Sequence, residues 1–327
     1  MAGLIKKMFH AKQIAALQLW WPIALLAIAA SSGCSEAFEP KGPYQSGLVV
    51  YSVLSNRSDS LIVRVYSTYD PAGNNPFSNS SDTEVKNARV VVSTDSTSVV
   101  LSSDIIPRTD KNRYSSDITA YVLHPFRLKK NAAYAISVTS PAGNASAKIV
   151  APDSGLVQAN NAFVLKAPEK YTDDITANVR LSSVSIGYIV RLYLEYDAKV
   201  GSQPVHVRVE VPDAIRSSTE VGFEYSYPML VRRITDPPQI SEIVYFTLDA
   251  YKAFLLDQVT KYGEIKLTSA TFIMTQVEPN LYQYYNIANG YLDPYSIRTD
   301  LPDFSNISGG FGLFGAMRDD SLVVDLH

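Results

Sequence analysis

Short runs in which apolar and polar residues alternate recur along most of the chain, and they limit its fold more than any single motif does. In YIVRLYLEYD (residues 188–197), Arg191, Tyr193 and Glu195 fall on one face, whereas Leu192 and Leu194 fall on the other. A period of two residues is the mark of a β-strand with one buried face. The chain is therefore predicted to be mainly β.

The first half contains six or seven such runs between residues 46 and 152, rich in β-branched residues and tyrosine. Turn signals such as DPAGNNP and SPAGN separate these runs, and SPAGN (residues 140–144) is typical of a hairpin. This pattern predicts an immunoglobulin-like or transthyretin-like β-sandwich over residues 48–152.

The segment PDSGLVQANNAF (residues 152–163) is the predicted seam between two domains, and longer strand-like runs follow it. Two later stretches, residues 249–263 and 281–292, carry apolar side chains at helical spacing instead, each with a glycine at or near its end. Residues 153–327 are thus predicted to form a β-rich domain with two short helices and a glycine-rich C-terminal motif.

The amino terminus has the three parts of a secretory signal. Lys6, Lys7 and Lys12 make the start basic, an apolar run follows over residues 14–30, and small residues come next. Residues 1–33 are therefore predicted to be a signal peptide.

Cys34, the single cysteine of the chain, directly follows this signal. An unpaired thiol is unusual in an exported protein. The small residues before it resemble the bacterial lipobox, although Ser31 stands where leucine is commonest. This resemblance implies that Cys34 is acylated and that residues 34–47 are a lipidated tether. The alternative is an ordinary signal peptide followed by a stray cysteine.

The charge of the mature chain argues against nucleic acid as a partner. Residues 1–33 hold three of the 29 basic residues and none of the 32 acidic ones, so the remainder carries a net charge of −6. Proteins that bind nucleic acids usually present a basic surface.

Known catalytic and metal-binding motifs are absent, and this predicts a protein that is not an enzyme and has no cofactor or metal. The adjacent acids Asp173–Asp174 and Asp319–Asp320 are poor acid/base pairs, because neighbouring side chains on a strand point to opposite faces. Both pairs are predicted to lie in loops.

Three glycines near the carboxyl end, Gly310, Gly312 and Gly315, spell the G-x-G-x-x-G of dinucleotide-binding proteins. That motif needs a following helix and an acidic residue about 20 positions later, and the sequence ends at His327. The cofactor hypothesis is rejected. The glycines are instead expected to allow close backbone approach and positive φ, with Phe311 and Phe314 filling a core and Asn306 binding turn amides.

Tyrosines gather in one short region of the C-terminal half, and aromatic rings can stack on the face of a sugar. The residues are Tyr282, Tyr284, Tyr285, Tyr291 and Tyr295. The simpler interpretation is that these rings pack helices onto a sheet in a mature chain that has no tryptophan. Tyr282, Tyr285, Tyr291 and Tyr295 remain candidates for contact with a ligand.

Several features together resemble a family of Bacteroidota outer-membrane lipoproteins whose domain has no assigned function. They are Cys34, the early run LVVYSVLS, the hairpin in AYAISVTSPAGNASAKI, and Asn306–Ile307 before the glycines at 309–315. The resemblance implies a surface-exposed lipoprotein that works with a TonB-dependent receptor in nutrient uptake. It implies no catalytic residues.

Three hypotheses about function follow from the sequence. The first is a lipid-anchored, non-catalytic binding or accessory protein of the outer membrane, partnered by such a receptor. The second is a glycan-binding surface adhesin or lectin that uses the tyrosine-rich region. The third is a polysaccharide hydrolase, which would need two carboxylates facing each other across a cleft.

Overall fold

A computed structural model describes residues 44, 46–70, 83–109, 111–112, 114–201, 203–219, 222–234, 241–289 and 304–327. Apart from residue 44, these residues belong to one compact unit. Cys34, Tyr291 and Tyr295 lie outside the described residues, and so does the predicted signal peptide.

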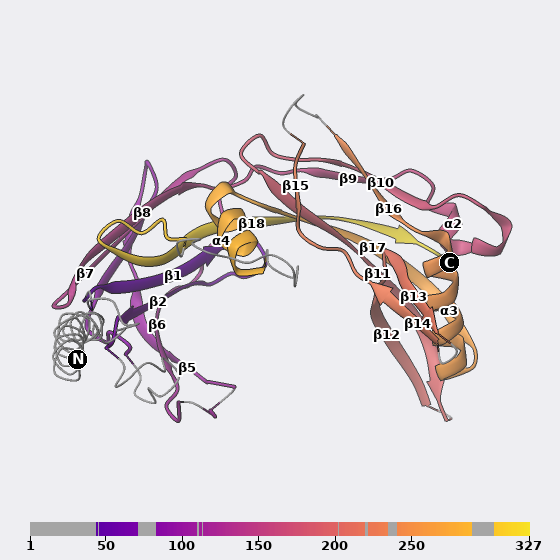
Figure 1. Ribbon diagram of the computed structural model, residues 1–327, viewed down its shortest axis with the longest axis horizontal. Helices are drawn as coiled ribbons and strands as arrows, with labels where there is room; N and C mark the ends of the chain where they lie inside the picture. Colours follow the sequence, from indigo (N-terminus) through magenta and orange to yellow (C-terminus); the bar gives the residue numbers. More distant parts are fainter. Residues whose placement is uncertain are drawn as a thin grey trace, which may run out of the picture. The chain divides into compact units, whose positions relative to one another are not determined.

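The described chain is mainly β, as the alternating pattern predicts (Figure 1). The strands are β1 (Leu48–Leu54), β2 (Leu61–Ser67), β3 (Arg89–Ser93), β4 (Ser98–Val100), β5 (Ser102–Ile106), β6 (Ile118–Leu123), β7 (Ala133–Ser140), β8 (Gly143–Val150), β9 (Leu156–Ala159), β10 (Ile175–Arg180), β11 (Gly187–Val200), β12 (Gln203–Val211), β13 (Ala214–Thr219), β14 (Gly222–Ser226), β15 (Val231–Arg232), β16 (Glu242–Phe246), β17 (Ile265–Val277) and β18 (Gly310–Asp325).

Both predicted helices are present, as α3 (Leu248–Tyr262) and α4 (Pro279–Asn289). Within the described residues there are also two single helical turns that were not predicted, α2 (Phe163–Lys166) and the 3₁₀ turn η2 (Pro168–Lys170). Segments this short carry no helical periodicity that would distinguish them from a loop.

A β-sandwich forms the first half, as predicted. One sheet contains β18, β1, β2, β6 and β5 in that order, and the other contains β4, β3, β7 and β8. Buried apolar side chains of both sheets, such as Val50, Val63, Val90 and Ile136, form a single core. The SPAGN hairpin is confirmed, because β7 and β8 pair from Ser140–Gly143 onward.

The strand order continues through β18 into the second half as β12-β11-β17-β18, so that these strands, β15 and the first-half sheet that contains β1 form one nine-stranded sheet. The second core lies between this second-half part, called the second sheet below, a smaller sheet with the order β16-β10-β9, and α3. The alternation in β11 has the predicted consequence. Leu192, Leu194 and Tyr196 are fully buried in this core, whereas Arg191 and Tyr193 lie on the opposite face of the sheet. The sheet therefore has one apolar face and one polar face.

Strand β18 belongs to both halves (Figure 1). Residues 310–316 pair with β1 in parallel, and residues 317–325 pair with β17 in antiparallel fashion. Phe314 and Ala316 enter the first core, and Leu326, just after β18, enters the second. The sequence predicted that the whole of β18 belongs to the second domain, residues 153–327. Its pairing with β1 was not predicted, because the paired residues are far apart in the chain and no local sequence pattern indicates the contact.

The glycine-rich segment lets the backbones of β18 and β1 approach closely. Gly312 has a φ of +112°, and a Cβ there would lie 2.1 Å from the carbonyl oxygen of Val50. A Cβ on Gly310 would lie 2.5 Å from the carbonyl oxygen of Leu48. No side chain fits at these distances, so this parallel pairing requires glycine at both positions.

Phe311 and Asn306 correct two details of the sequence analysis. Phe314 is fully buried, but Phe311 is 43% exposed. The two rings are separated by three positions, and on a strand an odd separation places side chains on opposite faces. Asn306 does not bind turn amides; its side chain bonds to the backbone of Phe314 within β18.

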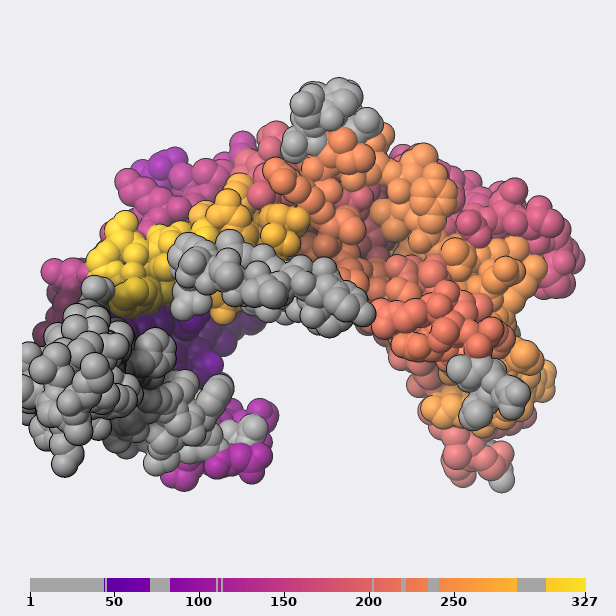
Figure 2. All heavy atoms as spheres, in the orientation of Figure 1, coloured from indigo at the N-terminus to yellow at the C-terminus, as the bar shows by residue number. Residues whose placement is uncertain are grey.

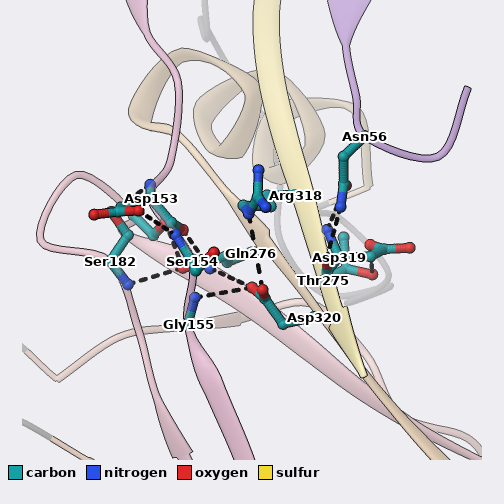
Figure 3. Close-up of polar contacts among 11 residues, drawn as sticks. Asn56, Asp153, Ser154, Gly155, Ser182, Thr275, Gln276, Arg318, Asp319 and Asp320 are labelled. Carbon is teal, nitrogen blue, oxygen red and sulfur yellow. Dashed lines mark hydrogen bonds and ion pairs between the residues drawn. The ribbon is translucent and has the colours of Figure 1, made fainter. Parts of the chain in front are cut away.

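A buried glutamine joins the predicted seam to the second sheet (Figure 3). The Gln276 side chain on β17 accepts hydrogen bonds from the Ser182 amide and the Ser185 hydroxyl, at 2.9 and 3.0 Å. It donates to the Asp153 carbonyl oxygen and to Asp320 Oδ2, both at 2.9 Å. All four hydrogen-bonding positions of the amide are thus used, as a buried amide requires.

Asp319 and Asp320 are in β18, which contradicts the predicted loop. They point to opposite sides of the strand, as neighbouring strand residues must (Figure 3). Asp320 accepts a hydrogen bond from the Gly155 amide, whereas Asp319 bonds to Thr275 on the polar face. The two carboxylates therefore serve different networks.

Candidate functional site

A cavity of about 530 Å³ lies between α4, the polar face of the second sheet and residues 228–230. The strands contribute Ile189, Arg191 and Thr275, and the helix contributes Tyr282 and Tyr285. Pockets of roughly 300–1,000 Å³ that combine apolar walls with a few polar groups are the usual binding sites for small ligands. This is the larger of the two cavities that form the candidate site.

Helix α4 is held in place by Glu278, which is buried at the start of the helix. Its carboxylate accepts hydrogen bonds from the amides of Asn280 and Leu281, at 2.9 and 2.7 Å. Burial raises the pKa of Glu278, whereas these amide donors act to lower it. A Cβ on Gly315 would lie 3.1 Å from the Leu281 Cβ, so the helix packs directly on β18. Figure 2 shows α4 at the surface beside the yellow C-terminal residues.

The two described tyrosines of the predicted ligand-contacting set both line this cavity. Tyr282 packs against Gly187, where an added Cβ would lie 2.2 Å from its ring. Tyr285 is 38% exposed and contacts the ring of Tyr284 edge-on, and Tyr284 in turn contacts Tyr51. Tyr282 is thus fixed by packing, and Tyr285 presents an accessible ring to the cavity.

A second cavity of about 330 Å³ adjoins the first, and Arg57 and Arg191 line both. The other lining residues are Tyr193, Arg208, Ile273 and Asp319. Arg57 comes from the turn between β1 and β2, in the first half of the chain, whereas the remaining residues belong to β11, β12, β17 and β18.

Each arginine of the second cavity has a carboxylate beside it. Arg57 donates hydrogen bonds to both carboxylate oxygens of Asp319, at 2.5 and 3.0 Å. This contact raises the pKa of Arg57 above its usual value. Arg191 Nε lies 3.3 Å from Glu210, across the β11–β12 pair.

Arg208 Nε lies 3.4 Å from Glu195, and its guanidinium stands 4.6 Å from the centre of the Tyr193 ring. Stacking of this kind fixes the plane of the guanidinium. Together the three pairs form a row in which positive and negative groups balance.

The site has no arrangement suited to metal chemistry in the part of the chain that the structure describes. No group of three or more His, Cys, Asp or Glu side chains there is placed to hold a metal ion. Of the described residues that line the two cavities, Asp319 is the single carboxylate, and Arg57 occupies both of its oxygens. Asp173 and Asp174 lie between η2 and β10, outside any helix or strand, as predicted.

Arg57, Arg191 and Arg208 are site residues that were not predicted from the sequence. A signal was present for Arg191, because the alternation in YIVRLYLEYD places it on the polar face with Tyr193 and Glu195. No sequence signal places Arg57 beside them, since its neighbour Asp319 is 262 positions away.

Within the described ranges, no helix combines the length and apolar character that a membrane span requires. No model of a known protein family matches the chain, and comparison with curated proteins also finds no match. The candidate site therefore rests on its own geometry.

Proposed function

We propose that this protein is a non-catalytic binding protein of the bacterial outer membrane, anchored through lipid on Cys34, which works with a TonB-dependent receptor in nutrient uptake. The signal sequence, the position of Cys34 and the family resemblance support the anchor and the partner. The observation that carries the binding role is the cavity between α4 and the polar sheet face, with Tyr282 and Tyr285 in its wall.

The anchor is tested by mass spectrometry of the amino-terminal peptide and by fractionation of cells. We expect acylated Cys34 in the membrane fraction and release of a Cys34→Ser variant from it, because acyl chains supply the membrane affinity. Unmodified Cys34 on a protein that is free in the medium would contradict this part of the proposal.

The partner is tested by purifying the lipoprotein, solubilised in mild detergent, from native membranes. The proposal expects a TonB-dependent receptor to co-purify with the wild-type protein. The control is a lipoprotein with the same anchor peptide and an unrelated body. A receptor recovered equally with this control, or no receptor at all, counts against the partnership.

A glycan-binding adhesin or lectin is the second candidate, and the accessible ring of Tyr285 favours it. A flat aromatic face beside planar, hydrogen-bonding groups such as those of Arg57 and Arg191 suits a sugar ring. The hydrolase hypothesis gains the least support, because the described cavity walls offer no facing pair of carboxylates.

Substitution of Tyr285 tests the site itself. We expect Tyr285→Ala to weaken ligand binding by roughly fivefold, since loss of one aromatic contact costs on the order of 1 kcal/mol. Tyr245→Ala is the matched control, because Tyr245 is 56% exposed on β16 and lines neither cavity. Equal binding by both variants would remove the cavity from the proposal.

A further inference from the structure

The two cavities form one continuous strip along β11. Alternate residues of this strand line the two cavities. Ile189 lines the first cavity, Tyr193 lines the second, and Arg191 between them lines both. A strand rises about 3.3 Å per residue, so the wall from Ile189 to Tyr193 is about 13 Å long. A strip of this length is longer than a single sugar ring.

The polar groups along the strip carry balanced charge. Three guanidinium groups, those of Arg57, Arg191 and Arg208, stand beside three carboxylates, those of Asp319, Glu210 and Glu195. The strip therefore presents mainly guanidinium donors, whose charge the adjacent carboxylates offset, and this suits uncharged hydroxyl groups better than an ionised ligand.

The second cavity keeps free hydrogen-bonding capacity. Arg191 and Arg208 each lie beside a carboxylate, at 3.3 and 3.4 Å. Within the described part of the chain, however, neither guanidinium has an acceptor at both the distance and the angle of a hydrogen bond. A guanidinium has five N–H donors in a fixed plane. Arg208 is also oriented by the Tyr193 ring beneath it. These donors are therefore available to a ligand that reaches past Arg57.

We infer that the site binds a neutral, linear oligosaccharide, with one sugar against Tyr282 and Tyr285 and a following sugar in a second subsite formed by Arg57, Arg191, Tyr193 and Arg208. This inference rests on the binding role proposed above and specifies its ligand class. It assigns chain-length selectivity to the second cavity and sugar stacking to the first.

The experiment uses the full-length lipoprotein in detergent and neutral gluco-, manno- and xylo-oligosaccharides from monosaccharide to hexasaccharide, with uncharged peptides of similar length as a comparison. The affinity for the preferred sugar is expected to rise by about tenfold from the monosaccharide to the longer oligosaccharides, because one or two added hydrogen bonds give a factor of this size. Salt should change it little, because the ligand carries no charge.

Arg208→Ala should reduce the gain from chain length, and it should weaken the binding of the longer sugars more than that of the monosaccharide. Arg216→Ala is the matched control, because Arg216 also lies 3.4 Å from a glutamate, Glu224, but lines neither cavity. Equal affinity for all chain lengths, or an equal loss at every length in Arg208→Ala, would overturn the second subsite.

Preference for the peptides or for acidic oligosaccharides, or no binding of any neutral sugar, would overturn the ligand class. The receptor co-purification is a separate measurement. A receptor that co-purifies with a protein indifferent to sugars would leave the proposed function standing and remove this inference alone.

Discussion

The side-chain amide of Asn306 pairs with the backbone of Phe314 through two hydrogen bonds. Asn306 Oδ1 accepts from the Phe314 amide at 2.9 Å, and Nδ2 donates to the Phe314 carbonyl oxygen at 2.7 Å. In a strand, the N–H and C=O of one residue point to the same side. Asn306 thus occupies the place of a neighbouring strand at this point of β18.

Replacement of Asn306 by alanine should therefore destabilise the protein. The variant leaves a donor and an acceptor of the fully buried Phe314 without a partner, and each such group costs about 1–3 kcal/mol. We expect urea unfolding to show a loss of about 2–4 kcal/mol. Asn178→Ala, which removes an exposed bond to Asn160, should cost within about 0.5 kcal/mol. Similar losses in the two variants would show that the Phe314 contact is dispensable.

Gly312 should tolerate no side chain. In Gly312→Ala the new Cβ would meet the Val50 carbonyl oxygen, so β1 and β18 would have to separate. We expect a loss of more than about 4 kcal/mol, visible as a large fall in melting temperature or a failure to fold.

Gly201→Ala separates this steric effect from the cost of backbone conformation. Gly201 also has positive φ, at +64°, but no atom lies within 4 Å of its added Cβ. That variant should lose only about 1–2 kcal/mol. If Gly312→Ala were as mild, close approach of the backbones would be the wrong explanation for the glycine.

Local patterns in the sequence were sufficient for most elements of the fold. The alternation in β11 and the helical spacing of α3 and α4 depend on neighbouring residues, and both predictions agree with the structure. The place of β18 depends on partners far away in the chain, since Leu48 pairs with Gly310. A single sequence holds no record of such pairing, so the strand was assigned to the second half only.

The candidate site was predictable in part, for the same physical reason. Tyr282 and Tyr285 were identified from a local cluster of aromatic residues, and both line the first cavity. Arg57 reaches the site from the turn after β1, and Arg208 reaches it through the β11–β12 pairing. Only the folded structure shows that Arg57 and Arg208 line the same cavity.

Gln276 gives a further test, because its amide connects four partners across the seam. Gln276→Leu would leave the Ser182 amide and the Asp153 carbonyl oxygen without this partner, in a site that water does not reach easily. We expect a loss of about 3 kcal/mol or more in the free energy of unfolding. Gln158→Leu, at an exposed position on β9, should change stability by less than about 0.5 kcal/mol. A small effect of Gln276→Leu would mean that the seam is held by apolar packing.

His206 should titrate above its ordinary range. Asp197 Oδ1 lies 2.9 Å from its Nδ1, and Glu195 lies 3.6 Å from its Nε2. The hydrogen bond to Asp197 is the largest cause that raises the pKa of His206. NMR titration of the imidazole should therefore show a higher pKa than in an unfolded chain, where it is about 6.5.

The direction of the pH dependence follows from this shift. Because the folded state holds the proton more tightly, the stabilisation by His206 is fully present below the unfolded pKa of about 6.5 and is lost as pH rises through the folded pKa. Asp197→Asn should lower the pKa of His206 markedly, and Glu195→Gln should lower it less, because the Asp197 contact is shorter. If Asp197→Asn left the titration of His206 unchanged, the pair would carry no electrostatic coupling at this edge of the sheet.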